Sequence, residues 1–255
     1  MKCLKILVAL TVVVSVLGCF SGSAKFVNVQ EHGPIAMVSF SLDNSIVPEG
    51  AERCTGPGLL QDEEKYYENH VKTAEALLEI FSDNLRGIFL DANFLDQHAV
   101  LSNEQYQELT KHVPRIVMGQ DIAPGRNMIT VGGFNYVSAY SRDILENLTE
   151  ILDVEMLLLI ENTLSYEMSR ALISSGISNA LLNTTVYLYQ KGEGIVFSNT
   201  FRTSSDEALT LIAGTASTER YPVVARSAGM KIIEEIRSHM IYQKEMAESL
   251  AAESH

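Results

Sequence analysis

The feature that most constrains the fold is a nearly continuous apolar run at residues 154–160. A strand that is apolar on both faces belongs in the middle of a sheet that other elements cover on both sides. The preceding residues predict a helix, because Ile144, Leu148 and Ile151 fall on one face. A helix that leads into a fully buried strand is typical of an α/β protein.

Further segments with clear periodicity complete this prediction. Strand patterns occur at residues 35–42, 88–95, 128–131, 182–189 and 195–201, the last two around a turn at 190–194. Helical patterns occur at residues 59–85, 102–113, 141–153 and 222–243. The sequence therefore predicts a mixed sheet of four to six strands flanked by amphipathic helices, with a C-terminal hairpin and a long terminal helix. An α+β arrangement is the alternative.

Two positions qualify the helical patterns. Ser102, with Gln105 three residues later, fits a capping box for a short helix. Gly229 interrupts the terminal helical pattern, where a glycine is about 1 kcal/mol less favourable than alanine. We expect one domain at residues 34–243, with an irregular insertion at 86–137 and a polar tail at 244–255.

The amino terminus carries an export signal. Lys2 and Lys5 precede an uncharged apolar segment at residues 6–17, which has the length of the apolar core of a secretory signal and is shorter than a membrane-spanning helix. Val16-Leu17-Gly18-Cys19 resembles a bacterial lipobox. The resemblance implies a signal peptide at 1–18, diacylglycerol and palmitate-type acylation of Cys19, and a tether at 19–33. Several acyl chains would anchor the protein stably, whereas one chain binds only marginally.

The expected location is thus the cell envelope, anchored by lipid in the outer membrane and facing the periplasm. One alternative is ordinary secretion with cleavage after Ala24, which would leave a secreted or periplasmic soluble protein; an uncleaved membrane anchor is the other. Removal of the signal peptide leaves Cys54 as the remaining free thiol, so no intramolecular disulfide is expected.

Charge narrows the range of partners. The chain has 19 Lys+Arg against 32 Asp+Glu, a formal net charge of −13. An acidic surface repels phosphate backbones, so no nucleic-acid partner is expected.

The second half of the chain also carries a resemblance to known domains. The helix and strand at 145–160, the hairpin at 186–197 and the closing helix at 225–236 are similar to small periplasmic α/β domains. Such domains occur in the curli-export lipoprotein, in lipoprotein activators of penicillin-binding proteins and in the amino-terminal domain of the Tol-Pal β-propeller protein. The resemblance implies a protein-binding or assembly module with an envelope protein partner, and no enzyme activity. A second likeness, to spirochaetal outer-membrane lipoproteins, implies amphipathic helices that touch a membrane leaflet.

Motifs for catalysis and cofactors are largely missing. The sequence has neither a serine-hydrolase elbow nor a phosphate-binding glycine loop, and we expect no cofactor. Asp91, Asp96 and His98 form a local cluster with metal-ligand chemistry, for which a solvated loop is the alternative. Glu63 and His70 share a helix face and are interpreted as solvent-exposed charge.

Two candidate interaction surfaces remain. Tyr187, Tyr189 and Asn183 share one face of the hairpin, which is either a recognition surface or a sheet face covered by a helix. Phe81 lies on the apolar stripe of the first long helix and would serve a membrane-lipid or small-ligand binder. The leading hypothesis is a protein-binding envelope lipoprotein. The lipid or ligand binder is the alternative, and a hydrolase of unrecognised type comes third.

Overall fold

A computed structural model describes residues 33–48, 63–89, 92–111, 128–166, 175–212 and 215–253. The predicted signal peptide, Cys19, Ala24 and Cys54 lie outside these residues. Among the described segments, no helix combines the length and hydropathy needed to cross a membrane.

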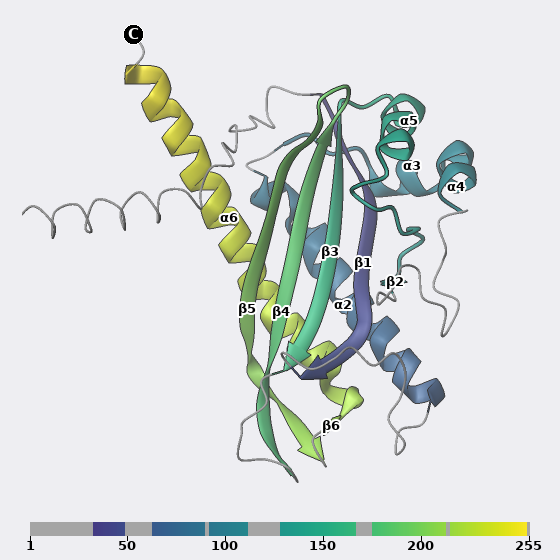
Figure 1. The fold of residues 1–255 in the computed structure, drawn as a ribbon, viewed down its shortest axis with the longest axis vertical. Helices are drawn as coiled ribbons and strands as arrows, with labels where there is room; N and C mark the ends of the chain where they lie inside the picture. Colours follow the sequence, from purple (N-terminus) through teal and green to yellow (C-terminus); the bar gives the residue numbers. More distant parts are fainter. Residues whose placement is uncertain are drawn as a thin grey trace, which may run out of the picture.

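Six strands form one mixed sheet in the order β2-β1-β3-β4-β5-β6 (Figure 1). The strands are β1 (Ile35–Pro48), β2 (Met128–Thr130), β3 (Met156–Tyr166), β4 (Ser175–Gln190), β5 (Gly194–Ile212) and β6 (Thr215–Ala216). β1 and β3 run parallel, and each of the other neighbouring pairs is antiparallel. The predicted α/β fold with a mixed sheet is confirmed.

Helices cover both faces of this sheet. They are α2 (Glu63–Ile88), α3 (Gln97–Leu101), α4 (Glu104–Thr110), α5 (Arg142–Leu152) and α6 (Tyr221–Glu253), with a short 3-10 turn at Thr218–Arg220 before α6. Side chains of α2 and α6 share one apolar cluster with Leu158 and Ile160. Side chains of α4 and α5 share another with Leu157 and Leu159. Residues 156–160 of β3 are fully buried between the two layers, as the apolar run predicts.

The two long helices pack closely because a glycine stands where they meet. A Cβ on Gly229 of α6 would lie 3.0 Å from Cδ2 of Leu77 and 3.2 Å from Cδ1 of Ile80. The glycine that weakens the helical pattern in the sequence therefore lets α6 approach α2. An exposed ion pair between Arg226 and Glu79 also joins the two helices.

Three local predictions are wrong. Residues 88–95 form no strand within their described part: α2 continues through Ile88, and Phe94 makes a single bridge with Ile35. The helix extends because Leu85 and Ile88 prolong the buried stripe of α2. Asn103 caps α4 in place of Ser102, its Oδ1 accepting hydrogen bonds from the N–H groups of the next turn. The terminal helix runs to Glu253, through most of the predicted polar tail.

The described part of the predicted insertion at 86–137 forms α3, α4 and β2. β2 lies at the edge of the sheet, whereas α3 and α4 belong to the second helical layer. The Tyr106 hydroxyl donates to the carbonyl of Val38 at 3.0 Å, and the Val137 N–H donates to Ser39 Oγ at 3.1 Å. These bonds attach the segment to β1 near the centre of the sheet.

Candidate functional site: the groove between β5 and α6

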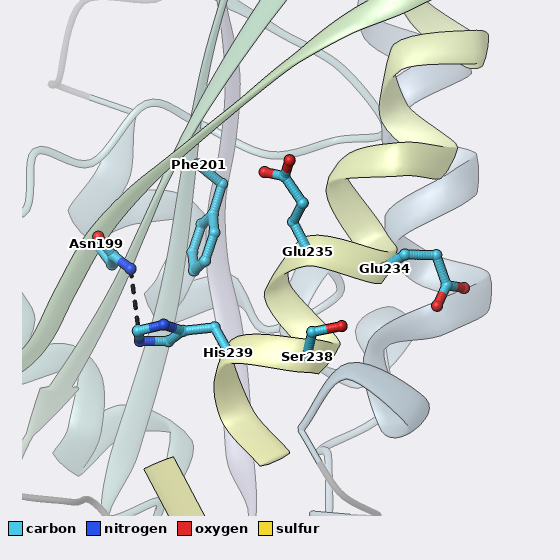
Figure 2. Close-up of a pocket in the computed structure, with 6 residues that line it drawn as sticks. All are labelled: Asn199, Phe201, Glu234, Glu235, Ser238 and His239. Carbon is cyan, nitrogen blue, oxygen red and sulfur yellow. Dashed lines mark hydrogen bonds between the residues drawn. The ribbon is translucent and has the colours of Figure 1, made fainter. Parts of the chain in front are cut away.

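A hollow lies where α6 crosses the outer edge of the sheet. Its lining residues come from β5 and from two turns of α6: Asn199, Phe201, Glu234, Glu235, Ser238 and His239 (Figure 2). A second hollow adjoins it, sharing Glu234 and Glu235 and extending to Arg202 and Lys231. Together they form a groove between β5 and α6.

The groove exists because β5 has an unpaired outer edge over most of its length. β6 pairs with Leu211 and Ile212 alone, so from Gly194 to Thr210 no described strand lies outside β5. α6 runs past this edge (Figure 1). Ser227, Lys231, Glu235 and His239 recur every four residues, and this spacing places them on one side of the helix, towards β5.

In the part of the groove nearer to β6, side chains of α6 form hydrogen bonds with the outward peptide groups of β5, which are those that point away from β4. The Asp206 N–H donates to Ser227 Oγ at 3.0 Å, and Lys231 Nζ donates to the carbonyl of Ser204 at 3.0 Å. The backbone N–H of Arg202 donates to the Glu235 carboxylate. We call Ser227, Lys231 and Glu235 the edge caps. Within β5 itself, the Thr200 N–H donates to Asn199 Oδ1 at 3.0 Å.

The titratable groups of the groove respond to their partial burial. Burial raises the pKa of Glu235, an effect that the hydrogen bond from the Arg202 backbone opposes. Burial lowers the pKa of His239. A neutral imidazole can accept a hydrogen bond, and His239 Nε2 lies 3.5 Å from Asn199 Nδ2.

The part of the groove nearer to the β4–β5 turn is lined by aromatic rings. The His239 ring centroid lies 6.0 Å from that of Phe197 and 5.5 Å from that of Phe201. Among the described residues no hydrogen bond joins Ser238 to His239 or to Glu235.

Beyond His239 the same side of α6 becomes apolar and exposed. Tyr242 and Met246 follow at the next helical spacings and are 56% and 43% exposed. Ile241 precedes Tyr242, lies about 100° from it around the helix and is 41% exposed. Here α6 runs away from the sheet (Figure 1). We call Ile241, Tyr242 and Met246 the distal patch.

The hairpin tyrosines are not a free recognition surface. Tyr189 is buried against α5, where its hydroxyl donates to Glu146 Oε2 at 2.6 Å, and burial, together with Glu146, raises its pKa. Tyr187 is buried beside the Tyr140 ring at 6.4 Å. Asn183, on the same face, is half-buried. The covered sheet face, which was the alternative interpretation, is what the structure shows for the two tyrosines.

Phe81, which we expected to face a lipid or ligand, lies in the core. It is 1% exposed and packs at 5.7 Å against the Phe40 ring in the core between α2 and the sheet. The stripe of α2 is thus used for internal packing, because the sheet lies directly beneath it. Phe81 offers no surface to a lipid or ligand.

The structure describes two of the three candidate metal residues. Asp96 and His98 are exposed at the start of α3, and Asp91 lies outside the described residues. Within the described ranges, no group of three His, Cys, Asp or Glu side chains is placed to hold a metal ion.

The prediction that His70 is solvent-exposed is wrong, because the apolar stripe of α2 carries it into the core. His70 is fully buried, and the Nδ1 atom lies 2.7 Å from the carbonyl oxygen of Tyr66. The Nε2 atom is buried and has no hydrogen-bond partner among the described residues, and the Tyr221 ring of α6 packs edge-on at 5.3 Å. Burial lowers the pKa of His70 to about 4. Its position one turn before Ala74 and two before Leu77, on the apolar stripe, is the signal that could have identified it.

No protein-family model matches this chain, and no curated protein matches its sequence. The class that the fold defines is an α/β domain with one mixed sheet between two helical layers.

Proposed function

We propose that this chain is a bacterial cell-envelope lipoprotein that acts as a protein-binding or assembly module. Cys19 would carry the lipid anchor, in the outer membrane facing the periplasm. The distal patch would contact the partner protein. The exposure of three large apolar side chains on one projecting stretch of helix is the observation that carries the proposal.

The chemistry around the distal patch favours a protein partner. Large exposed apolar side chains gathered in one place mark interaction surfaces, and aromatic and methionine side chains are enriched where proteins meet. Glu245 and Glu248 are exposed beside the patch. Such carboxylates repel anionic lipid headgroups, whereas they can pair with basic side chains at the rim of a protein interface.

The membrane-lipid or small-ligand alternative loses its main support. It needs an apolar helix face that reaches solvent, yet Phe81 and Leu78 of α2 lie in the core. The distal patch is one of the exposed apolar surfaces that remain for a lipid or ligand among the described residues.

A crosslinking experiment tests the protein-binding proposal. A photoreactive amino acid placed at Tyr242 in the full chain is expected to capture one specific envelope protein in cells. Changing Tyr242 and Met246 to Ser should lower co-purification of that protein about tenfold, as loss of two apolar contacts does. The matched control changes Val223 and Met230 to Ser; both are 49% exposed on the proximal part of the same helix.

Three outcomes would contradict the proposal. One is the absence of a specific envelope protein in the crosslinked material, and another is an equal loss of co-purification in the control. The third is flotation of the full chain carrying Cys19→Ala with liposomes, which would favour the membrane-binding alternative. Labelling with a palmitate precursor tests the anchor itself: Cys19→Ala should abolish the label.

A further inference from the structure

The outer edge of β5 has the properties of a strand that can pair with another strand. It is 19 residues long, and β6 covers its last two residues. Exposed edges of this kind expose rows of N–H and C=O groups that template pairing with another chain. Proteins counter the hazard by charging the edge or by covering it with a helix.

α6 both covers this edge and places charged side chains on it. Between Arg202 and Asp206, each edge cap bonds a different outward peptide group: Glu235 that of Arg202, Lys231 that of Ser204 and Ser227 that of Asp206. Lys231 also donates to Asp206 Oδ1 at 2.6 Å, which holds it along the edge. An incoming strand would have to displace all three side chains.

We propose that α6 guards the edge of β5 against antiparallel pairing with a second copy of this chain. The edge caps occupy the peptide groups through which the two copies would join. The guard is independent of the partner of the distal patch, because the two sets of side chains do not overlap.

The edge is complementary to itself. Two identical antiparallel strands pair about a two-fold axis, so each residue meets a counterpart at equal distance from the centre. β5 has a β-bulge against β4 between Ser204 and Ala208, yet the outward peptide groups of Arg202, Ser204 and Asp206 all face α6. A pairing of these outward groups centred on Ser204 would place Arg202 of one copy opposite Asp206 of the other, twice. Both side chains are exposed, and opposite charges facing each other across strands stabilise the pair. A second copy is therefore the occupant that this edge fits.

Removing the edge caps tests the guard. The cap-free variant changes Ser227, Lys231 and Glu235 to Ala, and the control changes Ser238, Lys244 and Glu245 to Ala. Each loses one hydroxyl, one amine and one carboxylate from α6, and both keep the parent's net charge. Sedimentation velocity of the full chain in mild detergent measures self-association, and hydrogen exchange of β5 amides shows where it occurs.

The expected result is an association constant for the cap-free variant at least about tenfold above those of the parent and the control. In the associated fraction, amides at residues 200–206 should exchange more slowly than in the monomer. Adding Arg202→Glu puts like charges opposite each other and should reverse the association.

Two results would overturn the inference: a folded cap-free variant that sediments like the parent, or association that leaves β5 exchange unchanged. A cooperative thermal transition establishes that the variant is folded. Should the triple variant lack that transition, Glu235→Ala alone is judged by the same two criteria.

Discussion

The two parts of α6 show how one helix takes on two different tasks. From Tyr221 to Met240, apolar residues at every third or fourth position are buried against α2, β4 and β5. From Ile241 onwards the helix continues to Glu253, yet its large apolar side chains are exposed. Helix formation in α6 therefore follows local propensity, whereas burial follows the strand alongside and ends where that strand diverges.

The largest expected difference between the two parts of α6 is in the free energy of unfolding, when isoleucines five residues apart are changed to alanine. Ile236 is fully buried and Ile241 is exposed. Ile236→Ala should lower the free energy of unfolding by about 2–5 kcal/mol, since it removes buried methyl groups and leaves a cavity. Ile241→Ala should change it by less than about 0.5 kcal/mol. Denaturant unfolding measures both values; equal losses would contradict the division of α6.

The next prediction compares two histidines that contact opposite ends of the buried part of α6. His70 of α2 packs against Tyr221 at the start of α6, and His239 of α6 lies in the groove. The pKa of His70 is lowered to about 4, so the unfolded chain binds its proton at higher pH than the native state does. The contribution of neutral His70 to the free energy of unfolding is complete above pH 6.5 and is lost as the pH falls from 6.5 to 4. It amounts to about 3 kcal/mol, at about 1.4 kcal/mol per unit of pKa.

His70→Gln should remove most of this pH dependence from the free energy of unfolding, measured by denaturant titration at each pH. His239→Gln is the comparison, and it should have a smaller effect because His239 is only partly buried. A pH profile unchanged by His70→Gln would show that His70 is not neutral in the native state.

A smaller effect is expected at the contact between α6 and α2. Gly229→Leu would place a side chain against Leu77 and Ile80 and should destabilise the fold by about 1–3 kcal/mol through overpacking. Adding Ile80→Ala should restore part of the loss. The matched change Met230→Leu, on the exposed side of the same turn, should leave the unfolding transition in place. A neutral Gly229→Leu would mean that α6 is not held closely to α2.

The smallest effects compare two exposed ion pairs. Glu79→Gln breaks the pair with Arg226 that joins α2 to α6, and Glu248→Gln weakens the pair with Lys244, which lies at 4.0 Å within the distal part. Surface pairs contribute about 0.2–1 kcal/mol, less in high salt, so both losses should be small. Thermal unfolding at low and high salt should show the larger salt dependence for Glu79→Gln, since its pair links two elements. The reverse order would contradict this comparison.

Much of the fold could be predicted because the decisive patterns are local. The apolar run before Ile160 identifies the central strand, and the alternation around residues 190–194 identifies the β4–β5 hairpin. The helix boundaries were harder, since the turn after Leu85 and the tail after Gln243 keep helical spacing although Gly87 and the polar composition suggest an end.

The candidate site could not be predicted in the same way. Phe81, Tyr189 and His70 have patterns that fit either a surface or a core, and which one applies depends on what packs over them. The edge caps are charged or polar residues on an exposed helix face, so the periodicity of the sequence does not distinguish them from other solvent-exposed residues. Their role arises from β5, which lies about 25 residues earlier in the chain.

The pairing of β1 with β3 has a consequence for how the chain folds. Ile35 stands in register with Met156, so the first strand finds its central neighbour only after more than a hundred residues have been made. α2 likewise awaits α6, to which Asn69 is linked through Thr218 across 149 positions. Contacts of such sequence separation demand loop closure before they stabilise anything, and they slow folding. We expect the amino-terminal half to have no stable structure alone and the whole domain to fold late and cooperatively, once α6 is available.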